Sequence, residues 1–223
     1  MKTKPIILSF LFIGLFLVGC ASQKDKLYSA IYQHDYATVE KIISSDKNLT
    51  NVFFEDKQCG IYPIQVAAMV GDEQILSLLI SHKANLTITD VAGWTALHHA
   101  AYNNNLKAVE ALLNAGVSVD IKTASVSPNR PSGLTPLMMA SMKNNIDVIK
   151  LLVQRGANPN IQDTDYKTAL FYCAGPCKNN YTESFEFLLR SGADSTIKNK
   201  KGQKLKNFSK FQDIFYHNRS TKK

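Results

Sequence analysis

Long hydrophobic runs are almost absent from this sequence of 223 residues, and the single one lies at the extreme N-terminus. A polytopic membrane protein needs several segments of about 20 apolar residues and is therefore excluded. Glycine and proline are sparse, with 11 and 7 residues, which excludes collagen-like and proline-rich fibrous proteins. Apolar residues make up 45% of the chain and charged residues 20%, as is typical of a globular protein with a substantial core.

Motifs of the common enzyme classes are absent as well. The sequence has no nucleophile elbow, no glycine-rich phosphate loop and no H-E-x-x-H zinc motif. Adjacent acids such as Asp72 and Glu73 suit the start of a helix, where carboxylates interact favourably with the helix dipole. We therefore predict a protein that is not an enzyme and that needs no cofactor.

The one long apolar run has the composition of an export signal. It extends from Pro5 to Val18 and follows two lysines, Lys2 and Lys4. With fourteen residues it is too short to span a membrane as a helix. We predict a signal peptide over residues 1–19.

The end of this signal, Leu17-Val18-Gly19-Cys20, resembles the lipobox of bacterial lipoproteins. The resemblance implies that Cys20 is acylated and that residues 20–25 form a tether. Because Ala21 rather than aspartate follows the cysteine, it also implies an outer-membrane anchor that faces the periplasm. Several acyl chains give stable anchoring, whereas a single chain does not. An ordinary secretory signal with an incidental cysteine is the alternative.

Positive charge is concentrated at the C-terminus. The whole chain has 26 basic and 18 acidic residues, and nine of the basic residues fall between Lys198 and Lys223, where Asp213 is the only acid. Residues 20–197 are nearly neutral. The basic segment is either a solvated terminus or a contact for anionic lipid or an acidic partner. A nucleic-acid partner is excluded by the predicted export.

A nine-residue pattern occurs four times, and this repeat decides the fold class. The copies begin at Gly60, Gly93, Gly133 and Tyr166, at intervals of 33, 40 and 33 residues. The second copy reads Gly93-Trp94-Thr95-Ala96-Leu97-His98-His99-Ala100-Ala101. A second apolar cluster follows each copy, and a turn signal such as Gly156-Ala157-Asn158 then closes the unit.

The pattern resembles the ankyrin repeat, whose units of about 33 residues open with G-x-T-P-L-H-x-A-A. The resemblance implies an all-α fold, an ankyrin-repeat solenoid of helix pairs with β-hairpin or turn fingers, with four full repeats plus atypical caps. Threonine at a helix start and proline at the first helical position support it independently. We predict a repeat domain over 26–218, divided into an N-terminal cap at 26–58, repeats at 59–90, 91–122, 131–163 and 164–199, and a C-terminal cap at 200–218, with a basic end at 219–223.

Departures from the pattern occur at particular positions. Tyr62 replaces the capping threonine of the first full repeat, a loss of about 1 kcal/mol, and Lys83 replaces its terminal glycine. Seven extra residues around 125–132 lengthen the loop before the third repeat. Three more near 175–181 enlarge the turn inside the fourth. The resemblance also gives His98 a structural role, with its imidazole bonded to backbone of a neighbouring turn, whereas metal binding is the alternative.

The four cysteines give one predicted lipid site and one candidate disulfide. Cys20 is assigned to lipid, and Cys59 is a single thiol. Cys173 and Cys177 are separated by Gly175-Pro176, which breaks a helix, so in an oxidising compartment they form either a disulfide or two buried thiols. No fourth ligand completes a zinc site, and we predict no metal.

In ankyrin arrays the hairpin tips and the first helices line a concave surface that holds a partner. In this sequence the variable positions of that surface are mostly apolar or aromatic, as in interface cores. Val66 and Met139 among them equally suit the core between repeats. The predicted partner-binding residues are Ile61, Trp94, His99, Tyr102, Arg130, Leu134, Met142 and Tyr172.

These features together predict a lipid-anchored periplasmic protein-binding module that is a monomer when free. Ankyrin lipoproteins of Gram-negative bacteria resemble, in several cases, immunity proteins that neutralise phospholipase effectors delivered by type VI secretion. The resemblance implies an inhibitor of such an enzyme, held at the membrane that the enzyme attacks. The alternative is a structural adaptor that tethers an envelope enzyme or a cell-wall component to the outer membrane.

Overall fold

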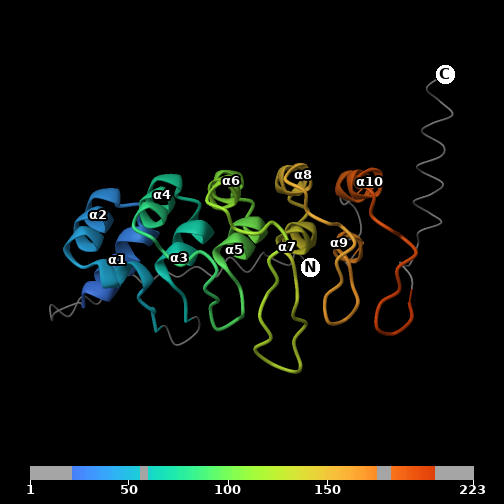
Figure 1. Ribbon diagram of the computed structural model, residues 1–223, viewed down its shortest axis with the longest axis horizontal. Coiled ribbons are helices and arrows are strands. Elements are labelled where there is room, and N and C mark those ends of the chain that lie inside the picture. Colours follow the sequence, from blue (N-terminus) through green and yellow to red (C-terminus); the bar gives the residue numbers. More distant parts are fainter. Residues whose placement is uncertain (1–21, 56–59, 175–181, 204–223) are drawn as a thin grey trace, which may run out of the picture.

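The computed structural model describes residues 22–55, 60–174 and 182–203, and in it helix pairs stack side by side into an elongated solenoid (Figure 1). The predicted signal peptide, Cys20, Cys59, Cys177, the enlarged turn at 175–181 and most of the predicted C-terminal cap lie outside the described residues. The helices are α1 (Gln23–Tyr32), α2 (Tyr36–Ser45), the short 3-10 helix η1 (Lys47–Asn51), α3 (Pro63–Val70), α4 (Glu73–Ser81), α5 (Ala96–Tyr102), α6 (Leu106–Asn114), α7 (Pro136–Lys143), α8 (Ile146–Gln154), α9 (Ala169–Cys173) and α10 (Thr182–Arg190).

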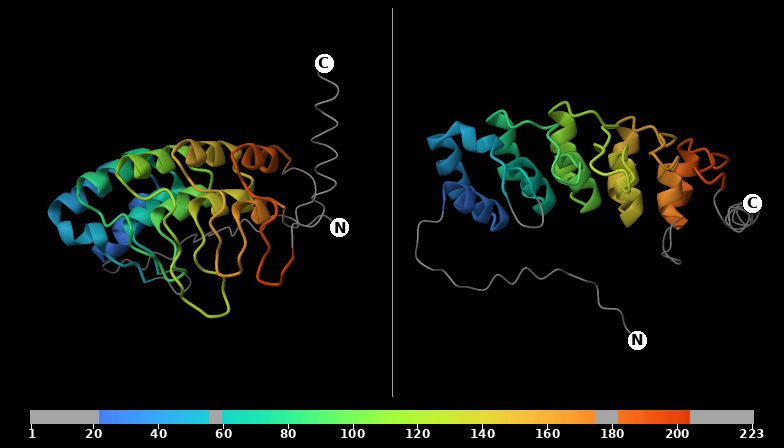
Figure 2. Two further views of the ribbon diagram at one scale, coloured as in Figure 1. Left: turned by 45° about the vertical axis from the view of Figure 1, so that its right-hand side comes forward. Right: turned by 90° about the horizontal axis from the view of Figure 1, so that it is seen from below.

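The helices form two layers, which Figures 1 and 2 show from three directions. The first helix of each pair contacts the first helix of the next, through α3–α5, α5–α7 and α7–α9. The second helices contact one another in the same way, through α4–α6, α6–α8 and α8–α10. Over the described residues no strand forms, and the single β-bridge joins Phe54 to Ile61. The predicted all-α solenoid is confirmed.

The first helices begin where the sequence places their caps. Thr95, Thr135 and Thr168 precede α5, α7 and α9, and Pro136 is the first residue of α7. The hydroxyl of Thr135 accepts a hydrogen bond from the amide of Met138 at 3.3 Å. A capping oxygen satisfies an amide that has no partner inside the helix, and proline at the first position leaves no donor unpaired.

The core lies between successive pairs and is built from small and aliphatic side chains. Leu97, Ala100 and Ala101 of α5 are completely buried. Val66 and Met139, which the sequence left open between core and surface, are also completely buried. Because no single pair can bury its apolar face alone, stacking of neighbours creates the core.

The N-terminal helices α1 and α2 extend the same stack. Their inward-facing residues Leu27, Ile31, Val39 and Ile43 are fully buried, and α1 packs against α3. His34, in the turn between α1 and α2, reaches across to Asp72 at the start of α4, with 2.8 Å between Nδ1 and Oδ2. The N-terminal pair is thus bound to the array by both apolar and polar contacts.

Lys83 confirms the departure expected at the end of the first full repeat. Gly116, Gly156 and Gly192 follow the second helices of later units with φ between +89° and +92°. Lys83 occupies the equivalent place after α4 with φ of +60°. This left-handed conformation costs a non-glycine residue about 1–2 kcal/mol.

The turns before the first helices form a row of fingers on one edge of the solenoid, the lower edge in Figure 1. We define them as the second finger (90–94), third finger (123–134), fourth finger (163–167) and fifth finger (199–203). Backbone hydrogen bonds join neighbours: the amide of Ala124 donates to Gly93, that of Thr164 to Ser132 and that of Lys200 to Asp165, at 2.8–3.0 Å. The third finger, which contains the seven extra residues, extends beyond the others (Figures 1 and 2).

Candidate partner-binding surface

The eight predicted contact residues differ widely in exposure. Ile61, His99 and Leu134 are buried, with exposed fractions of 5%, 8% and 6%, so their expected exposure is wrong. The main chain of Ile61 pairs with that of Phe54 and the main chain of Leu134 with Thr123, and these pairings hold both residues against the core. The other five keep accessible surface: Trp94, Tyr102, Met142 and Tyr172 are partly buried, and Arg130 is exposed.

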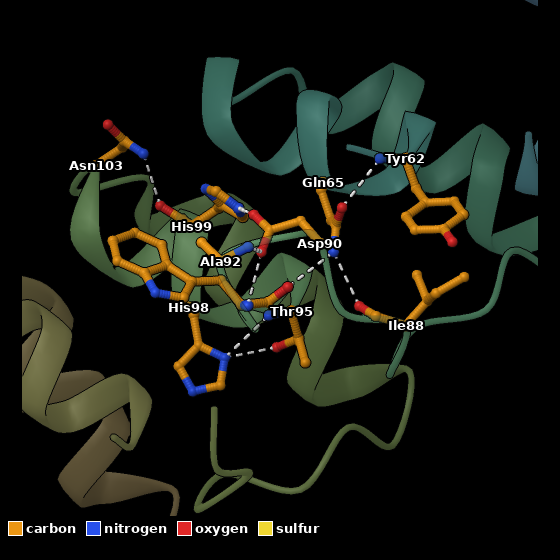
Figure 3. A network of polar contacts seen from close by, with 10 residues as sticks. Tyr62, Gln65, Ile88, Asp90, Ala92, Thr95, His98, His99 and Asn103 are labelled. Atoms are coloured by element: carbon orange, nitrogen blue, oxygen red, sulfur yellow. Dashed lines mark hydrogen bonds and ion pairs between the residues drawn. The ribbon is translucent and has the colours of Figure 1, made fainter. Parts of the chain in front are cut away.

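His99 is buried because it holds the second finger in place. Its Nε2 lies 2.7 Å from Oδ2 of Asp90. The other oxygen of Asp90 accepts from the amides of Ala92 and Trp94 at 2.9 and 2.8 Å (Figure 3). Asp90 therefore closes the finger and ties it to α5, and Trp94 is positioned by its own backbone.

Asp163 and Tyr172 repeat this arrangement in the fourth repeat. One oxygen of Asp163 accepts from the amides of Asp165 and Lys167, and the other accepts from the hydroxyl of Tyr172 at 2.5 Å. Burial, reinforced by the bond to Asp163, raises the pKa of Tyr172 well above its usual value. The phenol stays protonated and holds the finger, and one face of its ring lies below the ammonium of Lys167, 5.9 Å away.

An aromatic cluster occupies the first-helix face of the second repeat. The ring of Trp94 lies 5.2 Å from those of His99 and Tyr102. The ammonium of Lys143, from α7 of the next repeat, lies 4.5 Å from the centre of the Tyr102 ring. Trp94, Tyr102 and Lys143 thus present a joined aromatic and cationic surface that spans two repeats.

Two buried side chains link successive repeats. The amide of Gln65 donates to the carbonyls of Ile88 and Trp94 at 2.9 and 2.8 Å, and its oxygen accepts from the amide of Tyr62 at 3.0 Å (Figure 3). His98 occupies the same place in the second repeat and bonds to the carbonyl of Leu134. The structural role expected of His98 is therefore present.

Sequence reasoning missed Gln65 and Asp90, which hold this surface in place from beneath, and Lys143, which is part of it. Gln65 stands three residues after Tyr62, as His98 does after Thr95, so the register of the repeat was a usable signal. Asp90 and Asp163 stand three residues before Gly93 and Tyr166 and share a register in the same way. No comparable signal marks Lys143, whose contact depends on the spacing of α5 and α7.

Cys173 has 1% of its surface exposed and forms no disulfide with another described residue. Burial raises the pKa of its thiol to about 12, against the opposing effect of a bond to Ser141. Because Cys177 lies outside the described residues, a Cys173–Cys177 disulfide stays a prediction. In the described part of the chain no three metal-ligating side chains gather, and each helix there falls short of the length and apolar character that a membrane span requires.

Comparison with known proteins agrees with this geometry. A family model described as "Ankyrin repeats (3 copies)" matches residues 27–123 and 122–199. A solved structure of the predatory endopeptidase Bd0816 from Bdellovibrio bacteriovorus in complex with immunity protein Bd3460 contains a similar chain. The two chains are 31% identical with a TM-score of 0.66, and the match covers 85% of this chain and 93% of the other.

Curated relatives share the repeats but are much longer. Putative ankyrin repeat protein L371 of Acanthamoeba polyphaga mimivirus is 28% identical over 80% of this chain and 22% of its own length. Putative ankyrin repeat protein FPV034 of fowlpox virus is 28% identical over 78% of this chain and 37% of its own length. Human rabankyrin-5 is 31% identical over 58% of this chain and 12% of its own length. The chain thus spans between about an eighth and about two fifths of these three proteins.

Proposed function

Because this chain belongs to the ankyrin repeat family, we propose that it is an immunity-type inhibitor that binds an endopeptidase of the cell envelope and blocks it. The family's repeats form protein-binding modules, and the accessible aromatic and cationic surface of Trp94, Tyr102 and Lys143 suits that role. Membership of the family supports specific binding to another protein, and it does not identify that protein.

The assignment of an endopeptidase as the partner rests on one observation, the similarity to a chain of an endopeptidase–immunity complex. We take the matched chain to be the immunity protein, since a stack of helix pairs is a binding scaffold. The match extends over nearly all of that chain, whereas the curated relatives are matched only in part. It also favours an endopeptidase over the phospholipase effector that the sequence suggested. A phospholipase is the second enzyme class to be tested.

Anchoring of the inhibitor is part of the same proposal and is supported by the sequence around Cys20. A lipid-anchored inhibitor is confined to the compartment and the membrane surface where an envelope enzyme acts. Confinement raises the effective concentration of one partner for the other without any additional contact. A binding protein of modest affinity then protects as well as a tighter soluble one.

The test is an inhibition assay on envelope extracts of the source cells. Endopeptidase and phospholipase activities are separated by chromatography, and each fraction is assayed with and without the purified full chain. We expect stoichiometric loss of one endopeptidase activity, and we call the enzyme responsible the target endopeptidase. Loss of a phospholipase activity instead would transfer the proposal to that class. Binding without any inhibition would favour the structural adaptor.

A further inference from the structure

Tyr166 has a backbone conformation that favours glycine. Its φ is +60°, and its amide donates to the carbonyl of Asp163 at 2.9 Å, which closes the turn of the fourth finger. Gly93 and Gly202 close the same turn in the second and fifth fingers, with φ of +79° and +70°. A side chain in this conformation destabilises the fold, and glycine avoids the cost. Folding alone therefore favours glycine where this chain has tyrosine.

Contacts within the fold do not explain the tyrosine either. Its surface is 53% exposed. Across the described ranges its ring stacks on no other aromatic side chain, and its hydroxyl has no hydrogen-bond partner. A large aromatic residue that is left in solvent, at a backbone position where it is strained, points to a role outside its own chain.

Two neighbouring fingers carry exposed apolar residues as well. Val91 of the second finger is 56% exposed and Val126 of the third is 46% exposed. Together with Tyr166 they account for three of the five exposed large hydrophobic residues in the described part of the chain. The backbone bonds between fingers hold the three in a row, one on each of three consecutive fingers.

The exposed charges on these fingers that form no ion pair with another described residue are positive. Arg130 near the tip of the third finger and Lys200 and Lys201 of the fifth are exposed. The carboxylates of these fingers offer little to a partner: the Asp90 side chain is 7% exposed, Asp163 is 4% exposed, and Asp165 forms an ion pair with Lys167 at 3.1 Å. The finger edge thus combines separated apolar groups with unneutralised cations, and the complementary surface is acidic with an apolar pocket.

We propose that Val91, Val126 and Tyr166, with Arg130, Lys200 and Lys201, form a contact edge for an acidic protein surface, and that Tyr166 is its anchor. The inference rests on the proposed function, because the partner is the target endopeptidase. A protein surface suits the edge better than a membrane does. Its apolar groups stand singly on a backbone held by hydrogen bonds, whereas membrane insertion needs a continuous apolar face.

Four variants of the full chain distinguish the contribution of the Tyr166 ring to binding from the cost of the strained backbone to stability. Tyr166→Gly removes both the ring and the strain, and Tyr166→Ala removes the ring but keeps the strain. Tyr166→Phe keeps the ring. Lys83→Gly is the matched control, because it relieves the same backbone conformation at a position that belongs to none of the four fingers. Each variant is melted by circular dichroism and titrated with the target endopeptidase by calorimetry.

We expect Tyr166→Gly and Lys83→Gly each to raise the melting temperature by about 2–4 °C. Affinity should fall at least tenfold in Tyr166→Gly and Tyr166→Ala and stay unchanged in Tyr166→Phe and Lys83→Gly. Added salt should weaken the wild-type complex, because charges at the rim are screened. A Tyr166→Gly protein that is more stable and binds equally well would overturn the proposal.

Photo-crosslinking in cells keeps the edge testable if the endopeptidase assignment fails. Benzoylphenylalanine is placed at position 166 and, in the control, at position 83. An adduct with an endopeptidase at 166 alone supports both proposals. An adduct at 166 alone with an acidic envelope protein of another class supports the contact edge and shows that the partner is not an endopeptidase. Equal adducts at the two positions, no adduct, or adducts with lipid only would overturn the edge.

Discussion

The Nε2 atom of His98 lies 2.9 Å from the carbonyl oxygen of Leu134, so a histidine of the second repeat holds the finger of the third. Its Nδ1 accepts a hydrogen bond from the amide of Thr95 at 3.2 Å. With Nδ1 as acceptor, the proton of the neutral ring belongs on Nε2, which donates to Leu134. Both nitrogens are satisfied only in the neutral form, and burial lowers the pKa of His98 to about 4.

This depressed pKa predicts that acid destabilises the protein. In the unfolded chain a histidine titrates near 6.5, so between pH 6.5 and about 4 the unfolded state binds the proton more readily. The contribution of His98 is complete above pH 6.5 and is lost progressively as pH falls toward 4. The full loss is roughly 3 kcal/mol, measurable by urea titration at pH 7.5, 6, 5 and 4.

Gln65 supplies the control for that experiment. It bridges the first and second full repeats from the same register, through bonds that do not titrate. His98→Gln should therefore fold and should lose less stability than wild type between pH 7.5 and 4, while the acidic residues titrate alike in both proteins. Parallel pH profiles would show that His98 is not the group responsible.

Most of the fold could be predicted from the sequence because its signals are local and repeated. Thr95, Thr135 and Pro136 mark helix starts by their own chemistry, and small residues such as Ala100 mark the face that must pack closely. Because the same signals occur in four successive units, together they identify the fold class even though each one alone is weak. The same reasoning gave His98 its role, because the register of the motif places it next to a neighbouring turn.

The surface was harder to predict, because exposure is decided by contacts between repeats. His99 and Leu134 occupy variable positions of the repeat. The bond to Asp90 nevertheless holds His99 in a buried place, and the pairing with Thr123 buries Leu134. The strain at Tyr166 is a dihedral angle that the sequence does not state directly, although the alignment of Tyr166 with Gly93 in the repeat was a usable signal. The neighbouring Lys167 and Asp165 likewise form their ion pair only once the finger is folded.

The predicted anchor is tested by Cys20→Ala. Acylation requires the cysteine thiol, so we expect the variant to lose labelling by radioactive palmitate and to leave the membrane fraction. Because residue 20 lies before α1, the melting temperature of the purified variant should match that of the wild type. Absence of label from the wild type as well would leave the ordinary secretory signal as the explanation, and unchanged labelling of the variant would show that another residue carries the acyl chain.

The third finger is tested by deleting residues 125–131. The deletion keeps Ser132, whose amide donates a hydrogen bond to the hydroxyl of Thr164 at 3.0 Å. The carbonyl of Ser132 accepts a second hydrogen bond from the amide of Thr164. It leaves Thr123-Ala124-Ser132-Gly133-Leu134, the same length as the second finger, so the solenoid should fold unchanged. Affinity for the target endopeptidase should fall about tenfold or more as Val126 and Arg130 are lost.

Arg130→Ala separates the two contributions of that finger. It removes the planar donor group that suits a carboxylate and leaves the loop at full length. We expect a smaller loss of affinity than in the deletion and a weaker dependence on salt, since a rim charge acts mainly on association. If the shortened finger binds as tightly as wild type, the finger plays no part in recognition.

The aromatic cluster is tested by Trp94→Ala and Tyr102→Ala. As central contact residues, each should weaken binding of the target endopeptidase by about 2 kcal/mol. The structure also predicts a stability cost of about 1 kcal/mol, because each substitution removes the 5.2 Å ring contact between them. Tyr32→Ala is the control, since Tyr32 is 48% exposed and stacks on Tyr28 at 6.3 Å in the N-terminal pair. Calorimetric titration beside thermal melts decides between the two roles: lowered melting temperatures with unchanged affinity would make Trp94 and Tyr102 packing residues only.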